Sequence, residues 1–215
     1  MKRCGTILFL LSTSAASAHP HVFMDTVIEV FVNDNNEAES LQITWTYDDF
    51  YSLSTVSDMG LDPDGDGRLT PEENAELSGF DMKWIEGFEG DTYARMGDKP
   101  LVLSGPRDWT ARYEGGRLIS THMRDLEHPV KIGAEPLVIR AYDPTYYVAH
   151  FIDPPATVSG GSGCQAMIFG HDENAAEAAL QAALQNYNPD MNPEADFPAV
   201  GAIFSDEVQV TCGAS

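Results

Sequence analysis

The sequence predicts an α+β protein: a mostly antiparallel β-sandwich-like domain with an inserted EF-hand-like helix–loop–helix and one helix in its C-terminal half. Three observations lead to this prediction. Short runs of alternating apolar residues recur between turns rich in Gly, Pro, Asp and Asn, which is typical of antiparallel strands. An acidic loop at residues 62–73 separates two amphipathic segments. An alanine-rich stretch at residues 173–187 has the apolar spacing of a helix.

The first eighteen residues have the features of a secretory signal peptide. A positive start at Lys2 and Arg3 precedes a short apolar core and a small-residue cleavage site that ends at Ala18. We therefore expect the mature chain to begin at His19. Residues 19–215 contain no repeat and no linker, which predicts a single domain.

The charge of the chain is strongly negative. The formal net charge is −22 at pH 7, and removal of the two basic leader residues gives 10 − 34 = −24. Such a charge repels phosphate groups, so we expect neither nucleic acid nor an anionic membrane as a partner. An acidic surface of an exported protein and a cation-handling surface both fit this composition.

The first part of the mature chain predicts a hairpin that leads into a helix. Residues 22–32 form a strand buried on much of both faces, and residues 41–47 alternate cleanly as its partner. The turn between them is rich in Asn and Asp. Residues 48–59 then favour a helix whose apolar stripe consists of Phe50, Leu53 and Val56.

The acidic loop fits a twelve-residue calcium site of the EF-hand type. Carboxylates occupy positions one, three and five, Gly67 occupies position six, where the chain turns sharply, and a carboxylate closes position twelve. Position seven contributes a backbone carbonyl, and position nine a hydroxyl or a held water. The expected calcium ligands are Asp62, Asp64, Asp66, Arg68, Thr70 and Glu73. An acidic surface turn is the plainer alternative.

A second helix is predicted to leave the loop. Thr70 suits the N-cap, Pro71 the first helical position, and Glu73 completes a capping box. Apolar residues continue at helical spacing as far as Phe88. The calcium loop and its two helices therefore form an insert at residues 48–88, and because only one such loop occurs, a structural role is favoured over calcium sensing.

The rest of the chain predicts short strands and one helix. The expected strands are 93–96, 100–103, 109–113, 117–123, 135–142, 146–152, 156–159, 164–169 and 208–212, with 135–142 and 146–152 pairing through the turn at 143–145. The alanine-rich helix precedes a loop at 188–198. Cys164 and Cys212 most simply form one disulfide in an oxidising compartment, rather than a metal–thiolate site.

The new amino terminus offers nitrogen ligands for a transition metal. Residues two apart on a strand face the same side, so the imidazoles of His19 and His21 can meet one ion, together with the terminal amine. Such nitrogens suit zinc, copper, nickel or cobalt. Pro20 lacks the amide proton that a square-planar amino-terminal motif requires, whereas a copper histidine brace stays open. Further candidate ligands are His122, His128, His150 and His171.

The sequence contains no recognisable catalytic motif, so we expect no enzyme. Asp143 begins a tyrosine-rich turn, where its carboxylate either caps the turn or faces the amino-terminal histidines as a metal ligand.

Several segments together resemble a bacterial exported family, domain of unknown function 1007, described as an uncharacterised ABC-type transport system, periplasmic component. The segments are His19–Phe23, Thr44–Ser52, Asp62–Glu73, Tyr142–Tyr147 and Phe204–Cys212. The resemblance implies a periplasmic companion of metal transport that acts beside an inner-membrane metal transporter.

We therefore expect a periplasmic metal-binding accessory protein, with structural calcium and a transition metal at the amino-terminal histidines. The alternative is a periplasmic solute-binding component for a small organic ligand, with a pocket lined by Trp45, Tyr142, Tyr146 and Tyr147. A copper-dependent oxidase built on the histidine brace is the third hypothesis.

Overall fold

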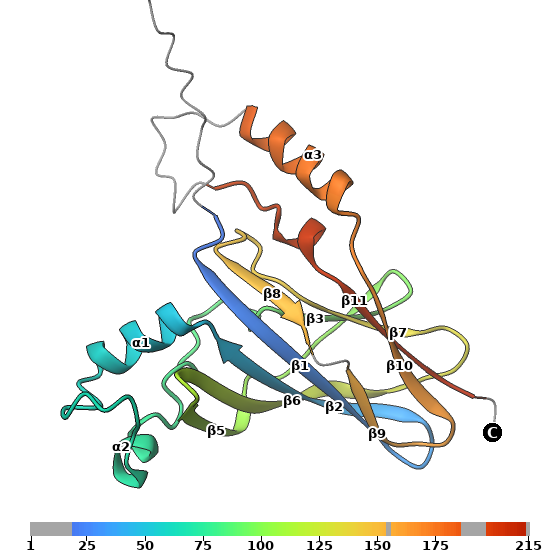
Figure 1. The fold of residues 1–215 in the computed structure, drawn as a ribbon. Coiled ribbons are helices and arrows are strands. Elements are labelled where there is room, and N and C mark those ends of the chain that lie inside the picture. Colours follow the sequence, from blue (N-terminus) through green and yellow to red (C-terminus); the bar gives the residue numbers. More distant parts are fainter. Residues whose placement is uncertain (1–18, 154–155, 186–196, 214–215) are drawn as a thin grey trace, which may run out of the picture.

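The computed structural model describes residues 19–153, 156–185 and 197–213, and these residues form two β-sheets and three α-helices (Figure 1). The predicted signal peptide and most of the loop at 188–198 lie outside the described residues. The first sheet has the order β5 (Arg107–Glu114), β6 (Arg117–Lys131), β2 (Glu37–Tyr47), β1 (Val22–Val32), β8 (Val148–Ile152), with β9 (Thr157–Gly160) also paired to β1. The second has the order β10 (Cys164–Phe169), β11 (Glu207–Cys212), β7 (Leu137–Ala141), β3 (Thr92–Met96), β4 (Lys99–Leu101). The helices are α1 (Asp49–Asp58), α2 (Pro71–Glu76), α3 (Glu173–Gln185) and the 3-10 turn η1 (Gly201–Phe204).

The prediction of a mostly antiparallel α+β fold is confirmed. One hydrophobic cluster joins the sheets, because alternate residues of both turn inward. From the first sheet it takes Ile28, Val30, Leu41 and Ile43, and from the second Leu137, Ile139, Val208 and Val210. Among the described helices, none combines the length and apolar character that a membrane crossing requires.

The β1–β2 hairpin forms as predicted, but β1 buries one face instead of two. Its even-numbered residues are buried, while the odd-numbered ones are half-buried or exposed. Phe23 is 46% exposed and stacks beside Phe151. β1 has neighbours on both sides, but only one face of this sheet packs on the second sheet, so the odd-numbered residues on the other face are less buried than the sequence suggests.

The predicted pairing of the strands on either side of residues 143–145 is wrong. β7 belongs to the second sheet, whereas β8 crosses to the first and runs parallel to β1, with Val148 opposite Val22 and His150 opposite Met24. β9 continues along the same edge of β1. The crossing brings the end of the tyrosine-rich turn beside the amino-terminal strand.

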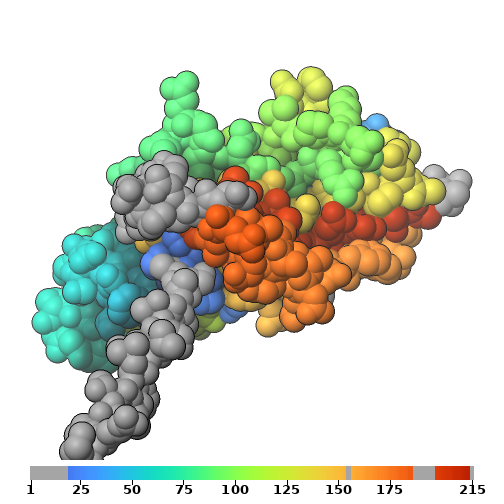
Figure 2. Space-filling model, turned by 90° about the horizontal axis from the view of Figure 1, so that it is seen from above, coloured from blue at the N-terminus to red at the C-terminus, as the bar shows by residue number. Residues whose placement is uncertain are grey.

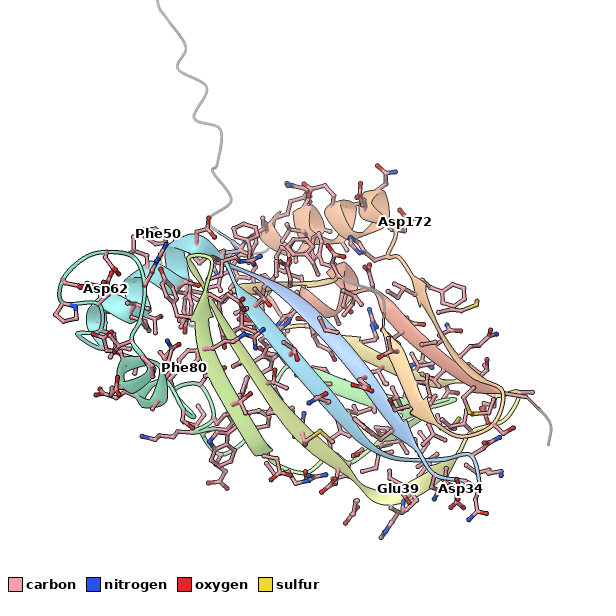
Figure 3. All side chains as sticks on the ribbon, turned by 60° about the horizontal axis from the view of Figure 1, so that its bottom comes forward. Asp34, Glu39, Phe50, Asp62, Phe80 and Asp172 are labelled. Atoms are coloured by element: carbon pink, nitrogen blue, oxygen red, sulfur yellow. A yellow bond between two sulfur atoms is a disulfide. The ribbon has the colours of Figure 1, made fainter. Side chains whose placement is uncertain are left out.

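The helices of the insert are shorter and less buried than predicted. In α1, Val56 is buried, but Phe50 is 80% and Leu53 62% exposed. α2 ends at Glu76 and gives way to turns, so the helical apolar face predicted as far as Phe88 does not form. Figure 3 places Phe50, Asp62 and Phe80 at one end of the molecule, opposite Asp34 and Glu39.

The C-terminal half forms largely as predicted. Cys164 and Cys212 are directly paired on β10 and β11 and joined by a disulfide. Ala176 and Leu180 of α3 are buried, whereas residues 186 and 187 of the predicted helix lie outside the described residues. Figure 2 shows α3 and the C-terminal strands in orange to red.

Candidate functional site

The loop between α1 and α2 brings three carboxylates together. Asp62, Asp64 and Asp66 each offer an oxygen, and these oxygens lie within 4.8 Å of one another. Among the described residues, this is the one group of three or more His, Cys, Asp or Glu side chains with such spacing. Hard cations prefer several oxygen ligands in a flexible loop, so the group fits calcium by its chemistry.

The backbone of the loop is held by its own carboxylates. Asp62 accepts hydrogen bonds from the amides of Asp66 (3.0 Å) and Gly67 (3.1 Å), and Asp66 accepts one from the amide of Arg68 (2.8 Å). Gly67 has a φ of 76°, as the sharp turn at position six predicted. These hydrogen bonds therefore hold the loop in the shape that brings the three carboxylates together. The carboxylate oxygens keep further lone pairs that accept no backbone amide.

The predicted capping box of α2 is present. Thr70 Oγ1 accepts a hydrogen bond from the amide of Glu73, and Glu73 Oε2 accepts one from the amide of Thr70 over 2.7 Å. Glu73 Oε2 also accepts from Thr70 Oγ1 (3.0 Å). Glu73 is thus engaged with the helix start and is not part of the Asp62–Asp66 group.

The amino-terminal histidines lie side by side. The rings of His19 and His21 are 4.9 Å apart, edge to face, and His21 lies 4.8 Å from Tyr147. His19 is buried and stacks on Phe197 at 3.8 Å. The two imidazoles therefore lie close together, but strand geometry is not the reason, because residues 19–21 precede β1, which begins at Val22.

Two further predicted ligands have other surroundings. His122 has Trp45 and Trp84 as ring neighbours, at 4.7 and 5.6 Å. Asp143 caps its own turn, because its carboxylate accepts hydrogen bonds from the amides of Thr145, Tyr147 and Val148. The hydrogen bonds of Asp143 therefore match the alternative in which its carboxylate caps the turn.

Thr26, His150 and Asp91 form a buried polar cluster that was not predicted from the sequence. His150 Nδ1 is 3.0 Å from Thr26 Oγ1, and His150 Nε2 is 3.5 Å from Asp91 Oδ2. Burial raises the pKa of Asp91, opposed by its contact with His150. The cluster joins β1, β8 and the start of β3, which no local sequence pattern links.

His122 belongs to the same interior. Burial, together with the neighbouring charge of Arg124, lowers the pKa of His122 to about 3, so its ring is neutral at pH 7. Neither ring nitrogen has a hydrogen-bond partner within the described part of the chain. A neutral, unpartnered imidazole behaves here as an apolar core side chain.

Arg124 fixes the segment that precedes β3. Its guanidinium donates to the carbonyl oxygens of Glu89 (2.6 Å), Thr92 (3.2 Å) and Ser104 (2.8 Å). It also lies 5.0 Å from the centre of the Trp84 ring. Burial lowers the pKa of Arg124 to about 10, which still leaves it charged at pH 7. Its charge is therefore satisfied largely by backbone carbonyls.

A pocket of about 210 Å³ opens beside this interior, between the insert and the inner face of β1 and β2. It is lined by Val22, Met24, Trp45, Tyr47, Tyr51, Asp81, Phe88, Asp91, Tyr147 and Val148. The apolar and aromatic residues of the pocket belong to patterns that the sequence shows. The two carboxylates, Asp81 and Asp91, lie in turns, and only the tertiary structure determines which residues surround them.

The comparisons with known proteins concern nearly the whole chain. The model of the family described as "Protein of unknown function (DUF1007)" matches residues 4–212. A protein of Haemophilus influenzae described as "Uncharacterized protein" is 24% identical over 217 residues, which cover 99% of this chain and 100% of that protein. The family match agrees with the five segments that resemble it in the sequence, and the chain therefore belongs to the DUF1007 family.

Proposed function

We propose that this chain is a periplasmic metal-binding accessory protein of a membrane transport system. It binds structural calcium in the EF-hand-like loop and a transition metal, one of zinc, copper, nickel or cobalt, at His19 and His21. The observation that carries the proposal is the meeting of the Asp62, Asp64 and Asp66 oxygens within 4.8 Å. The partner would be an inner-membrane metal transporter, and the role is binding rather than catalysis.

Calcium has a clear structural task in this proposal. α2 spans six residues and buries none of them, so few contacts hold so short a helix: Asn74 accepts a hydrogen bond from the amide of Tyr113, and the C-cap Leu77 is buried. An ion held by the three carboxylates would tie the start of the loop to the residues before α2. We expect Glu73 to exchange its capping contacts for the ion, or to contribute through its second oxygen.

Calorimetric titration with calcium tests the loop. We expect one saturable site in the wild type and at least a tenfold weaker site in Asp64→Asn, because a bound cation loses one carboxylate. Asp98→Asn, an exposed turn residue away from the loop, is the matched control. Hydrogen exchange should show that chelation loosens residues 49–76 first. Equal calcium binding by the Asp64 and Asp98 variants would rule out this site.

The histidine pair is tested separately. Mass spectrometry of the exported protein establishes whether His19 is the first residue, on which the amine ligand depends. Uptake of zinc, copper, nickel and cobalt is then compared between the wild type, a His19→Ala/His21→Ala variant and a His128→Ala control. We expect uptake to fall in the double variant alone. Equal uptake in all three proteins would contradict the transition-metal part.

The pocket favours a second candidate function, a periplasmic solute-binding component. Trp45 and Tyr147, both predicted for such a pocket, line it. Tyr142 instead stacks on Tyr93 at 4.1 Å, and Tyr146 stacks on Phe204 at 4.3 Å, so these two tyrosines pack elsewhere. The candidate is thus supported by a pocket with a different lining from the one predicted.

A further inference from the structure

The pocket between the insert and the first sheet combines aromatic walls with two carboxylates. Trp45 and Tyr47 come from β2, Tyr51 from α1, Phe88 from the segment before β3, and Tyr147 from the residue before β8. Its volume of about 210 Å³ is below the roughly 300–1,000 Å³ of sites for drug-sized ligands. The occupant is therefore a small molecule.

Asp81 enters this pocket with one oxygen satisfied and one not. Its Oδ2 accepts hydrogen bonds from Tyr47 Oη (2.8 Å) and Ser120 Oγ (2.5 Å). Its Oδ1 is buried and has no hydrogen-bond partner among the described residues. A buried carboxylate oxygen without a donor costs free energy, so the arrangement favours a ligand that brings one.

Asp91 is the second carboxylate of the pocket, and it is 7% exposed. Its backbone has a φ of 46°, a conformation that residues other than glycine rarely adopt. The preceding Gly90 is required there, because a Cβ would lie 2.2 Å from Trp84. The hydrogen bonds of Arg124 to Glu89 and Thr92 hold this segment from both sides. Asp91 is therefore presented by a tightly fixed turn.

The charges around the pocket favour a cation. The neighbouring His122 is neutral, and His150 Nε2 lies 3.5 Å from Asp91 Oδ2. Arg124 does not line the pocket and directs its donors to backbone carbonyls. Aromatic faces attract cations through their quadrupoles, most strongly when water is excluded.

We infer that this pocket binds a small organic cation, a protonated primary amine whose N–H groups reach Asp81 and Asp91 while the aromatic residues surround its carbon chain. The inference rests on the solute-binding candidate and uses none of the proposed metal ligands, although Tyr147 of the pocket wall lies 4.8 Å from the ring of His21. A metal ion fits less well, because aromatic carbons cannot replace its oxygen ligands. The larger hollow of about 350 Å³ beside β4 is lined by exposed charges of both signs, such as Lys99, Glu127 and Lys131, and carries no comparable inference.

The test is calorimetric titration of the mature protein with n-butylammonium, its neutral counterpart n-butanol, and tetramethylammonium. We expect saturable one-to-one binding of n-butylammonium. n-Butanol should bind roughly tenfold or more weakly, because it brings no charge to the carboxylates. Tetramethylammonium should also bind more weakly, since it has no N–H for Asp81.

Variants locate the site. Asp81→Asn should weaken n-butylammonium binding roughly tenfold or more. Asp34→Asn is the matched control, because Asp34 lies at the opposite end of the molecule from the insert (Figure 3). If Asp81→Asn does not fold, Asp91→Asn takes its place. The comparison of n-butylammonium, n-butanol and tetramethylammonium uses the wild type and therefore needs no variant.

Three results would overturn the inference: no saturable binding, equal binding of n-butylammonium and n-butanol, or equal loss in the Asp81 and Asp34 variants. Tighter binding of tetramethylammonium would overturn the choice of a primary amine. The loop and histidine variants are titrated with n-butylammonium as well. If these variants bind n-butylammonium as the wild type does, the amine site is distinct from the proposed metal sites. A failure of one proposal can then be told from a failure of the other.

Discussion

Tyr47 Oη donates a hydrogen bond to Asp81 Oδ2 over 2.8 Å, and this contact joins the inner face of β2 to the segment that follows α2. Ser120 of β6 donates to the same oxygen. Burial raises the pKa of Asp81, while the two hydrogen bonds act in the opposite direction. The ends of β2 and β6 thus both hold the segment after α2 through one carboxylate oxygen, while the amide of Leu118 in β6 holds α1 through Ser52 Oγ.

Tyr47→Phe should lower the free energy of unfolding by about 1–3 kcal/mol, because a buried carboxylate loses one of its donors. Urea denaturation measures the loss, and Tyr93→Phe, whose ring stacks on Tyr142, is the control. Losing the donor raises the folded pKa of Asp81 further above its ordinary 3.8. The loss of unfolding free energy in Tyr47→Phe should therefore be largest when Asp81 is ionised, and it should shrink as the pH falls through the pKa of Asp81. A deficit independent of pH would contradict this.

Local sequence patterns predicted the parts of the fold that local interactions determine. The β1–β2 hairpin, the capping box at Thr70 and Glu73, and the loop that gathers Asp62, Asp64 and Asp66 all depend on residues near one another in the chain. Periodicity alone also placed most strands within a few residues.

Long-range arrangements were not predictable in the same way. The turn at Asp143 predicted a hairpin, but the choice between partner strands depends on the free edge of β1, which the sequence of the turn does not encode. Asp81, Asp91 and Arg124 lie in segments with ordinary turn and strand patterns. Their roles arise from partners as distant in sequence as Tyr47 and Trp84, so only the tertiary structure reveals them.

His122→Leu should reduce the acid sensitivity of the fold. The folded pKa of about 3 lies below the ordinary 6.5, so between these values the unfolded chain binds a proton that the native state does not. Stability is therefore lost as the pH falls from about 6.5 towards 3, at up to about 1.4 kcal/mol per pH unit. The raised pKa values of Asp81 and Asp91 oppose this loss, so the variant comparison isolates the histidine.

The measurement is urea denaturation at pH 7 and at intervals down to pH 4. At pH 7 the change should stay within about 1 kcal/mol, because neither ring nitrogen has a hydrogen-bond partner among the described residues. His128→Leu, at an exposed position, should keep the wild-type slope. An unchanged slope in His122→Leu would show that the ring is not held neutral.

Removing the disulfide should lower stability substantially. Cys164 and Cys212 are 48 residues apart, and the chain-entropy relation gives about 4 kcal/mol for a closed loop of that length. A Cys164→Ser/Cys212→Ser variant is compared with the wild type by urea denaturation, with and without reductant. Reductant should shift the wild type towards the variant and leave the variant unchanged. A difference below about 1 kcal/mol would mean that the bond adds little to the β10–β11 pairing.

Arg124→Met should destabilise the fold by about 3 kcal/mol or more, because several carbonyls lose a charged donor in the interior. Arg124→Lys should recover only part of this loss, since a compact ammonium cannot reach segments that the planar guanidinium bridges. Arg112→Met is the control. Arg112 forms an exposed pair with Glu114, and such pairs contribute about 0–1 kcal/mol.

Hydrogen exchange shows where the Arg124 variants open. If Arg124 holds the turn that carries Asp91, the amides of residues 89–92 should lose protection before those of β1 and β2 do. The same variants should then weaken n-butylammonium binding even at temperatures where they remain folded, because Asp91 is no longer held in place. Uniform loss of protection across both sheets, with amine binding retained by the folded fraction, would assign Arg124 to general core stability instead of to the pocket.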